Sequence, residues 1–263
     1  RAPLRISVGS NLSGVALKFS EPFEKQPAEA TSFQLDFVFP QPERLDVVGN
    51  LGAANRFALS LWNRPEGLSL RRGTVSFGGS YPLLPSRDGL EIRGTIGQLD
   101  LDEWLGVVAD VASDTEIHSL LSTVDLELMD FSAFGQRLGA TSLSAERRPP
   151  SWLIDIDSEP VAGQIVMPLD LARREQIQAT MARLHLSAGE FEEEQDIDPR
   201  ELPGLLVTAD DFIVGQRSYG RLAADVRAEN AGLRFASLET ANDGFTLSSS
   251  GDWYMHPGGD STR

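Results

Sequence analysis

The fold is decided by the stretch Phe33-Gln34-Leu35-Asp36-Phe37-Val38-Phe39, in which every second side chain is large and aromatic or aliphatic. Successive side chains of a β-strand point to opposite faces of a sheet, so the four residues would share one face. The pattern therefore predicts a strand with one apolar and one more polar face. Such an apolar row suits either a closed core or the open floor of a curved sheet.

The same alternation recurs along the rest of the chain, separated by turn clusters at 63–67, 86–89 and 242–244. Strands at about ten-residue spacing, joined by short turns, are typical of an antiparallel meander. The fold class predicted from the pattern is therefore mainly β, with one long antiparallel sheet. The further alternating segments are Phe57/Leu59/Leu61, Leu90/Ile92/Ile96, Val124/Leu126/Leu128, Trp152/Ile154/Ile156, Leu222/Ala224/Val226 and Phe245/Leu247.

One segment, at about 100–112, has a helical period instead. Asp100 is suited to the N-cap position, and Glu103 would complete a capping box. A second short helical turn is expected at Asp198-Pro199, where proline would take the first helical position. The apolar face of the first helix would consist of Leu101, Trp104, Leu105, Val108 and Val111.

A short motif occurs twice, as Phe134-Gly135-Gln136-Arg137 and as Val214-Gly215-Gln216-Arg217. Each copy is followed by alternating residues, which predicts a weak hairpin repeat near 134–145 and 214–228. Hairpins laid side by side would build a modular sheet. The alternative is that two similar hairpins arose by chance.

The composition restricts the possible functions. The 263 residues include 23 Lys and Arg against 39 Asp and Glu, which gives a net charge of −16. Nucleic-acid binding depends on neutralising phosphates with Lys and Arg, so no nucleic-acid partner is expected. The chain has no cysteine, which excludes disulfides, a thiolate nucleophile and thiolate metal ligands. Hydrophobic residues make up 41% of the chain, as in a globular protein.

No residue pattern points to catalysis, a metal or a cofactor. His118, His185 and His256 lack the spacing of zinc ligands, and no G-x-S-x-G motif is present. The acidic run at 192–198 lacks the glycine and the final glutamate of a calcium loop, so a solvated loop is expected there. The chain is therefore predicted to bind no metal and no cofactor and not to be an enzyme. An enzyme with a pair of carboxylates acting on an envelope polymer stays an alternative.

Several stretches, in this order and spacing, resemble the AsmA-like proteins of Gram-negative bacteria, most closely the very long YhdP type. They include Glu21-Pro22-Phe23-Glu24-Lys25 and the ending Ser250-Gly251-Asp252-Trp253. The other stretches are 13–15, 94–104, 134–138, 152–158 continuing to Gly163 and Pro168, and 198–203. Together they cover almost the whole chain.

The resemblance implies a bridge-like lipid transfer protein, in which a long curved antiparallel β-sheet forms an open apolar groove. The chain would be one continuous groove segment, 1–263, of a longer periplasmic protein that conducts phospholipids between the inner and outer membranes. Its partners would be phospholipid acyl chains, and the two membranes through segments outside this chain. The anchor in the inner membrane would also be a segment absent from this chain.

Residues on the apolar side of the strands would form the lipid-binding groove. The alternative function is a structural or assembly module of the cell envelope that binds protein partners. In that module Leu101, Trp104, Leu105 and Val108 would be buried against the sheet. The predicted groove residues are Phe33, Leu35, Phe37, Phe39, Leu59, Leu61, Ile154, Ile156, Leu184, Leu186, Val226 and Leu247.

Overall fold

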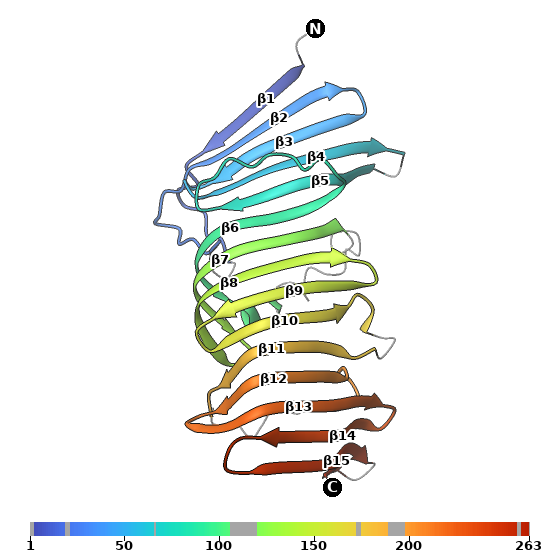
Figure 1. The fold of residues 1–263 in the computed structure, drawn as a ribbon. Helices are drawn as coiled ribbons and strands as arrows, with labels where there is room; N and C mark the ends of the chain where they lie inside the picture. Colours follow the sequence, from blue (N-terminus) through green and yellow to red (C-terminus); the bar gives the residue numbers. More distant parts are fainter. Residues whose placement is uncertain are drawn as a thin grey trace. The chain divides into compact units, whose positions relative to one another are not determined.

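A computed structural model describes residues 3–18, 22–65, 67–105, 120–171, 175–188, 198–256 and 259–262. The fold is mainly β, as the alternation predicts, and all of its named elements are strands (Figure 1). The chain forms two compact units, Arg1–Ser144 and Ala145–Arg263. That the whole chain is one continuous groove segment stays a prediction.

The strands of the first unit are long enough for several alternating side chains on each face. They are β1 (Leu4–Ser10), β2 (Phe33–Gln41), β3 (Arg44–Leu51), β4 (Asn55–Arg64), β5 (Gly67–Phe77), β6 (Gly89–Asp100) and β7 (Leu121–Ala133). β8 (Gln136–Arg148) extends over the boundary between the units. The second unit continues with β9 (Ser151–Ser158), β10 (Val161–Pro168), β11 (Ile177–Leu186), β12 (Leu205–Val214), β13 (Arg217–Glu229), β14 (Gly232–Ala241), β15 (Thr246–His256) and β16 (Gly259–Thr262).

Each strand lies beside its neighbours in sequence, so the order in the sheet is the order in the chain. Most of the described registers are antiparallel, as predicted. Three pairs are parallel instead: β5–β6, β6–β7 and β11–β12. A parallel pair needs a connection that returns to the starting end of the strand. The connection at 78–88 makes the first of these returns, and the three parallel pairs are where the simple antiparallel meander fails.

One face of the sheet in the first unit is mainly apolar in the described registers. Directly paired residues lie on the same face of a sheet, so the registers define rows across the strands. One row consists of Val8, Leu35, Gly49, Phe57, Val75, Ile92 and Val124. The next row consists of Ile6, Phe37, Val47, Leu59, Gly73, Leu90 and Leu121.

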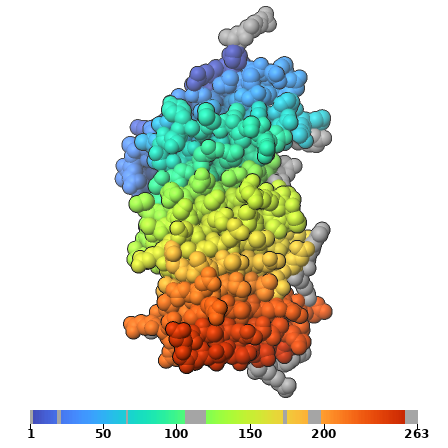
Figure 2. Space-filling view, viewed as in Figure 1, coloured from blue at the N-terminus to red at the C-terminus, as the bar shows by residue number. Residues whose placement is uncertain are grey.

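The opposite face of this unit is polar and covered by the connection between β5 and β6. The Thr74 hydroxyl donates a hydrogen bond to the Leu83 carbonyl at 2.7 Å. Arg72 Nη1 donates to the Pro85 carbonyl at 3.3 Å. In Figure 1 the connection runs across β4 and β5, and Figure 2 shows its turquoise atoms over this face. The small polar side chains beneath it are therefore shielded from solvent.

The second unit has the same division into an apolar and a polar face. Its apolar face contains the row Ile156, Gly163, Met181, Ala209, Leu222, Thr240 and Leu247. Its polar face is held by side-chain pairs between neighbouring strands. Gln164 Nε2 donates to Asp155 Oδ1 at 2.9 Å, and Arg183 Nη2 donates to Asp157 Oδ1 at 2.5 Å.

The expected helix begins where the sequence places it. Leu101–Leu105 are helical, and Asp100 Oδ1 accepts the backbone N–H groups of Asp102 and Glu103 at 2.9 and 3.1 Å. These bonds are those of an N-cap. The rest of the predicted helix, including Val108 and Val111, lies outside the described residues. At the second expected helical turn, 199–201 form a single turn in which the Glu201 N–H donates to the Asp198 carbonyl at 3.1 Å, and no helix continues from it in the described residues.

Both copies of the short motif lie at a turn between paired strands. The turn begins at the first residue of the motif in one copy and at the second residue in the other. Phe134 and Gly135 form the turn between β7 and β8, whereas Gly215 and Gln216 form the turn between β12 and β13. Phe134 is 76% exposed and has a φ of 53°, and both carboxylate oxygens of Asp102 accept N–H groups of this turn. That the motif reflects a repeat stays a prediction.

Candidate functional site

The six groove residues predicted in the first unit lie on its apolar face. The four on β2 share a face by alternation, and the Phe37–Val47 and Val47–Leu59 pairs connect them to β4. All six side chains are half-buried. The structure thus brings together Phe33, Leu35, Phe37, Phe39, Leu59 and Leu61.

The six groove residues predicted in the second unit likewise share its apolar face. Ile156 and Leu247 occupy the ends of one row, and the Val161–Leu184 pair joins β11 to the same face. Val226 is buried, whereas Leu247 is 44% exposed because β16 pairs only with the far end of β15. The others, Ile154, Ile156, Leu184 and Leu186, are half-buried.

On β4 the pattern of burial is the reverse of that in an ordinary soluble sheet. On the polar face Ser60, Thr74 and Ser76 are 0% exposed. On the apolar face of β4 Leu59 and Leu61 are only half-buried, whereas Val47, Phe77 and Leu128 on other strands of this face are buried. Serine and threonine are mostly exposed in folded proteins, and large apolar side chains are mostly buried. The apolar side chains of β4 are thus more accessible to solvent than the small polar side chains on its other face.

Two glycines let large side chains lie flat against the apolar face of the first unit. A Cβ atom at Gly49 would lie 2.6 Å from Cζ of Phe57, and one at Gly73 would lie 2.7 Å from Cδ2 of Leu59. The aromatic ring and the leucine therefore occupy the space above the glycine backbone. Sequence reasoning missed both glycines, because alternation marks large apolar residues and gives no signal for a gap between them.

Aromatic side chains gather at one margin of the apolar face in the first unit. Phe23, from the connection between β1 and β2, lies 5.7 Å from Phe77 and 5.8 Å from Trp104 between ring centroids. A cavity of about 150 Å³ beside them is lined by residues that include Phe23 and Leu51. Phe23 was not predicted as a site residue, because it lies in a connection without periodicity.

A second aromatic group lies in the second unit. Tyr219 is 5.7 Å from Phe212 and 6.1 Å from Phe245 between ring centroids. Phe212 pairs with Leu184 and with Gly220, so this group belongs to the apolar face. Each unit therefore combines a half-buried aliphatic surface with an aromatic cluster.

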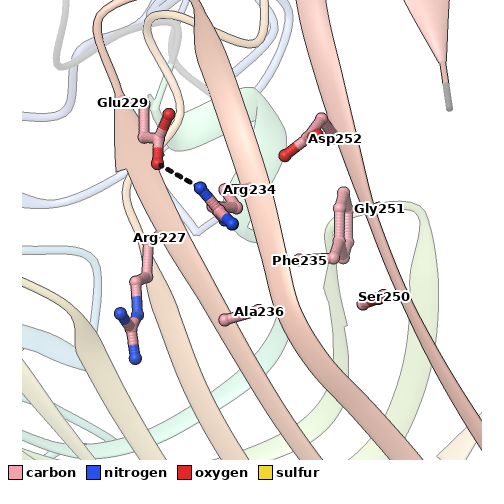
Figure 3. A pocket seen from close by; sticks show the side chains of 8 residues that line it. All are labelled: Arg227, Glu229, Arg234, Phe235, Ala236, Ser250, Gly251 and Asp252. Atoms are coloured by element: carbon pink, nitrogen blue, oxygen red, sulfur yellow. Dashed lines mark ion pairs between the residues drawn. The ribbon is translucent and has the colours of Figure 1, made fainter.

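A hollow of about 330 Å³ lies near the turn between β13 and β14 and is lined mainly by charged side chains (Figure 3). Arg234 Nη1 is 3.8 Å from Glu229 Oε1. The Tyr254 hydroxyl donates to Glu229 Oε2 at 2.7 Å and lies 3.1 Å from Asp252 Oδ1, and these carboxylates raise the pKa of Tyr254 to about 12. Arg227 donates to Asp225 at 2.7 Å. The charges in the hollow thus neutralise one another.

The described residues give no sign of a metal site or of a membrane-spanning helix. No three potential metal ligands lie close together in the described part of the chain, and no helix there is long and apolar enough to cross a membrane. His185 Nε2 instead lies 2.7 Å from Asp211 Oδ2. His118, the side chain of His256 and most of the acidic run at 192–198 lie outside the described residues.

The chain was compared with protein families, characterised proteins and solved structures. The model of the family described as YhdP protein matches residues 2–263, which is nearly the whole chain. Comparison with curated proteins and with solved structures found no match. The chain therefore belongs to the YhdP family.

Proposed function

We propose that this member of the YhdP family conducts phospholipids, with their acyl chains on the apolar faces of its two units. The twelve predicted groove residues would be the contacts for the acyl chains. The chain would act as a segment of a periplasmic protein that links the inner and outer membranes through segments outside it. No catalytic step is required for this function.

The observation that carries the proposal is the reversed burial on β4 of the first unit. Fully buried Ser60, Thr74 and Ser76 show that the polar face is covered by the chain itself. On β2 and β4 the leucines and phenylalanines of the opposite face are only half-buried, which supports an apolar face that is partly open there. A surface of this composition is stabilised when an apolar ligand replaces water on it.

The energy of lipid transfer explains why such a surface is needed. Transfer of an acyl chain from water to an apolar site is favourable by about 0.8 kcal/mol per CH₂ group. Two chains of roughly fifteen carbons each would therefore cost on the order of 20 kcal/mol to expose to water. A lipid that moves between membranes needs apolar contact along its whole path, which neighbouring strands can provide.

The test uses tryptophans that lie on opposite faces. Trp152 and Trp253 lie on the apolar face, where they pair with Met167 and Leu233. Trp62 lies on the polar face, with the Arg71 guanidinium 5.0 Å from its ring centroid. Variants that keep one tryptophan each, with phenylalanine at the others, would be loaded with phospholipids brominated on the acyl chains.

Bromine quenches tryptophan fluorescence on contact, so we expect quenching at Trp152 and Trp253 and little at Trp62. Equal quenching of all three, or none, would contradict the proposal. In cells, a photo-crosslinking residue at Leu35 should give lipid adducts. The same residue at Val48, which lies on the polar face of the adjacent strand, should give few.

The alternative function, an assembly module that binds protein partners, required burial of the helix beginning at Leu101. Trp104 does contact Phe23, but Leu105 is 49% exposed. Native mass spectrometry separates the two functions, because phospholipid retained on the purified chain is expected only for the conducting surface.

A further inference from the structure

The apolar face of the first unit has two different margins at the ends of its strands. The first margin is where β2 and β4 begin and where β3 and β5 end, and we call it the strap margin. It contains Phe33, Leu51 and Phe77. The second margin, the hairpin margin, lies at the turns between β2 and β3 and between β4 and β5. It contains Phe39 and Leu61.

The strap margin is covered by the connection between β1 and β2, described at 11–18 and 22–32. The Thr31 N–H donates to the Asn11 carbonyl at 2.8 Å, and the Gly52 N–H donates to the Ser32 carbonyl at 2.7 Å. Asn55 Nδ2 donates to the Pro22 carbonyl at 3.4 Å. The first bond closes the connection on itself, and the other two fasten it to the turn between β3 and β4 and to the start of β4.

The covering connection is ordered by a buried cation and presents an aromatic ring to the sheet. Lys25 is 4% exposed, and its Nζ donates to the carbonyls of Val15 and Gln26 at 2.8 and 3.0 Å. Phe23, two residues earlier, packs on Phe77 and on Trp104. The strap margin is therefore bounded by aromatic rings and covered by a connection whose buried lysine is held by backbone carbonyls.

The hairpin margin is exposed to solvent. Residues 40–43 and 63–65 at its two turns are all exposed, and they include Glu43 and Arg64. Just inside the margin, on the polar face, Arg44 Nη2 is 2.7 Å from Asp46 Oδ2. Charged and hydrated groups can therefore lie at this margin without loss of solvation.

The strands are long enough to hold a lipid lengthwise between the margins. β2 has nine residues, which at about 3.3 Å per residue span roughly 30 Å. The hydrocarbon core of a bilayer is about 30 Å thick, so one leaflet's chains extend about 15 Å. A phospholipid aligned with the strand thus has room for its headgroup beyond the end of its chains.

We infer that phospholipids lie along the strands of the first unit in one direction, with the headgroup at the hairpin margin and the chain ends towards the strap margin. The inference rests on the proposed function. In the opposite direction the phosphate would meet Phe23, Phe77 and Trp104 and lose its water, while the buried Lys25 ammonium nearby already donates to two backbone carbonyls. In the inferred direction the headgroup stays hydrated, and the chain ends meet aromatic rings.

The test uses Phe33 and Phe39, which are matched positions on one strand and one face. Both are half-buried phenylalanines, six residues or roughly 20 Å apart. The chain has no cysteine, so Phe33→Cys and Phe39→Cys can each be labelled with bimane without background. The full chain would be loaded with phosphatidylcholine that carries a nitroxide either near the glycerol or near the end of one acyl chain.

The nitroxide near the chain end should quench the label at position 33 more strongly than the nitroxide near the glycerol does. The order should invert at position 39. Equal ratios at the two positions, or the reverse order, would overturn the inferred direction while leaving lipid binding intact. No quenching by either probe at either position would instead count against the proposed function, and the inference would fall with it.

Discussion

Asp36 joins the first two strands on the polar face of the first unit. Its carboxylate accepts hydrogen bonds from Arg5 Nη2 at 2.8 Å, from the Ser7 hydroxyl and from Gln34 Nε2 at 3.3 Å. The hydrogen bond from Arg5 is the largest cause that lowers the pKa of Asp36, followed by the bond from Ser7. β1 has no other neighbour than β2 in the described sheet, so this network matters for its attachment.

We expect Asp36→Asn to weaken the attachment of β1 at neutral pH. The folded pKa of Asp36 is below its unfolded value of about 3.9, so its stabilising effect is complete above that value and is lost as the pH falls through the folded pKa. The variant should therefore have a lower free energy of unfolding at neutral pH, measured by urea unfolding. Its free energy of unfolding should also change less between neutral and acidic pH than that of the wild type. Asp130→Asn is the control, because its pair with Arg137 is exposed and contributes little. The same decrease in the free energy of unfolding at acidic pH in the wild type and in Asp36→Asn would contradict the expectation.

A substitution at Gly73 tests whether Leu59 needs the space above the glycine backbone on the apolar face. In Gly73→Ala the new Cβ would lie 2.7 Å from Cδ2 of Leu59 and 3.0 Å from Cδ1 of Leu90, both ends of flexible side chains. We expect the leucines to be pushed away from the sheet, at a cost of about 1–3 kcal/mol in the free energy of unfolding.

The matched control is Gly97→Ala, where a Cβ meets nothing within 4 Å. Its free energy of unfolding should change by no more than about 0.5 kcal/mol. Lipid retention by Gly73→Ala, measured by native mass spectrometry, should fall below that of Gly97→Ala. Retention unchanged in Gly73→Ala would show that the flat packing does not matter for lipid binding.

At the scale of elements, the sequence predicted the strands well where large side chains alternate. The segments around Phe33, Phe57 and Trp152 are strands with the faces that alternation assigns. The shared face of all twelve groove residues within their units also followed from periodicity, because a period of two fixes the side on which each residue lies.

The parallel pairs and the covered polar face could not be predicted. The segment 86–89 has the composition of a hairpin turn, but it ends a connection that crosses the polar face before β6. Burial of Ser60, Thr74 and Ser76 depends on that crossing and not on their own residue type. Likewise, Leu247 is exposed because β16 pairs only with the far end of β15, and no local sequence pattern predicts the length of that pairing.

The connection between β1 and β2 gives a prediction at this scale. Phe23→Ala removes the ring that joins Phe77 to Trp104, so we expect a loss of about 1–2 kcal/mol in unfolding free energy. Amide hydrogen exchange at the end of β5 should accelerate. Phe134→Ala, at an exposed turn, should leave both unchanged. Unaltered exchange in Phe23→Ala would show that the connection does not hold the strap margin.

For the whole molecule, a net charge of −16 governs encounters with membranes. Repulsion from anionic vesicles is screened as the Debye length falls from about 30 Å at 0.01 M salt to about 8 Å at 0.15 M. Lipid uptake from anionic vesicles should therefore become several-fold faster over this range, followed with a fluorescent phospholipid. Uptake from zwitterionic vesicles is the control and should change little. Faster uptake at low salt would mean that local positive charge dominates the encounter.

The half-open apolar face also has a consequence for how the protein is made. Without a bound lipid, leucine and phenylalanine side chains on the apolar face of each unit would be partly exposed to water, and such surfaces promote aggregation. A ligand that binds only the folded state stabilises it by mass action. Binding of the first lipids would thus complete the maturation of the newly folded chain. Protein without lipid should aggregate more and unfold at a lower temperature than protein loaded with lipid.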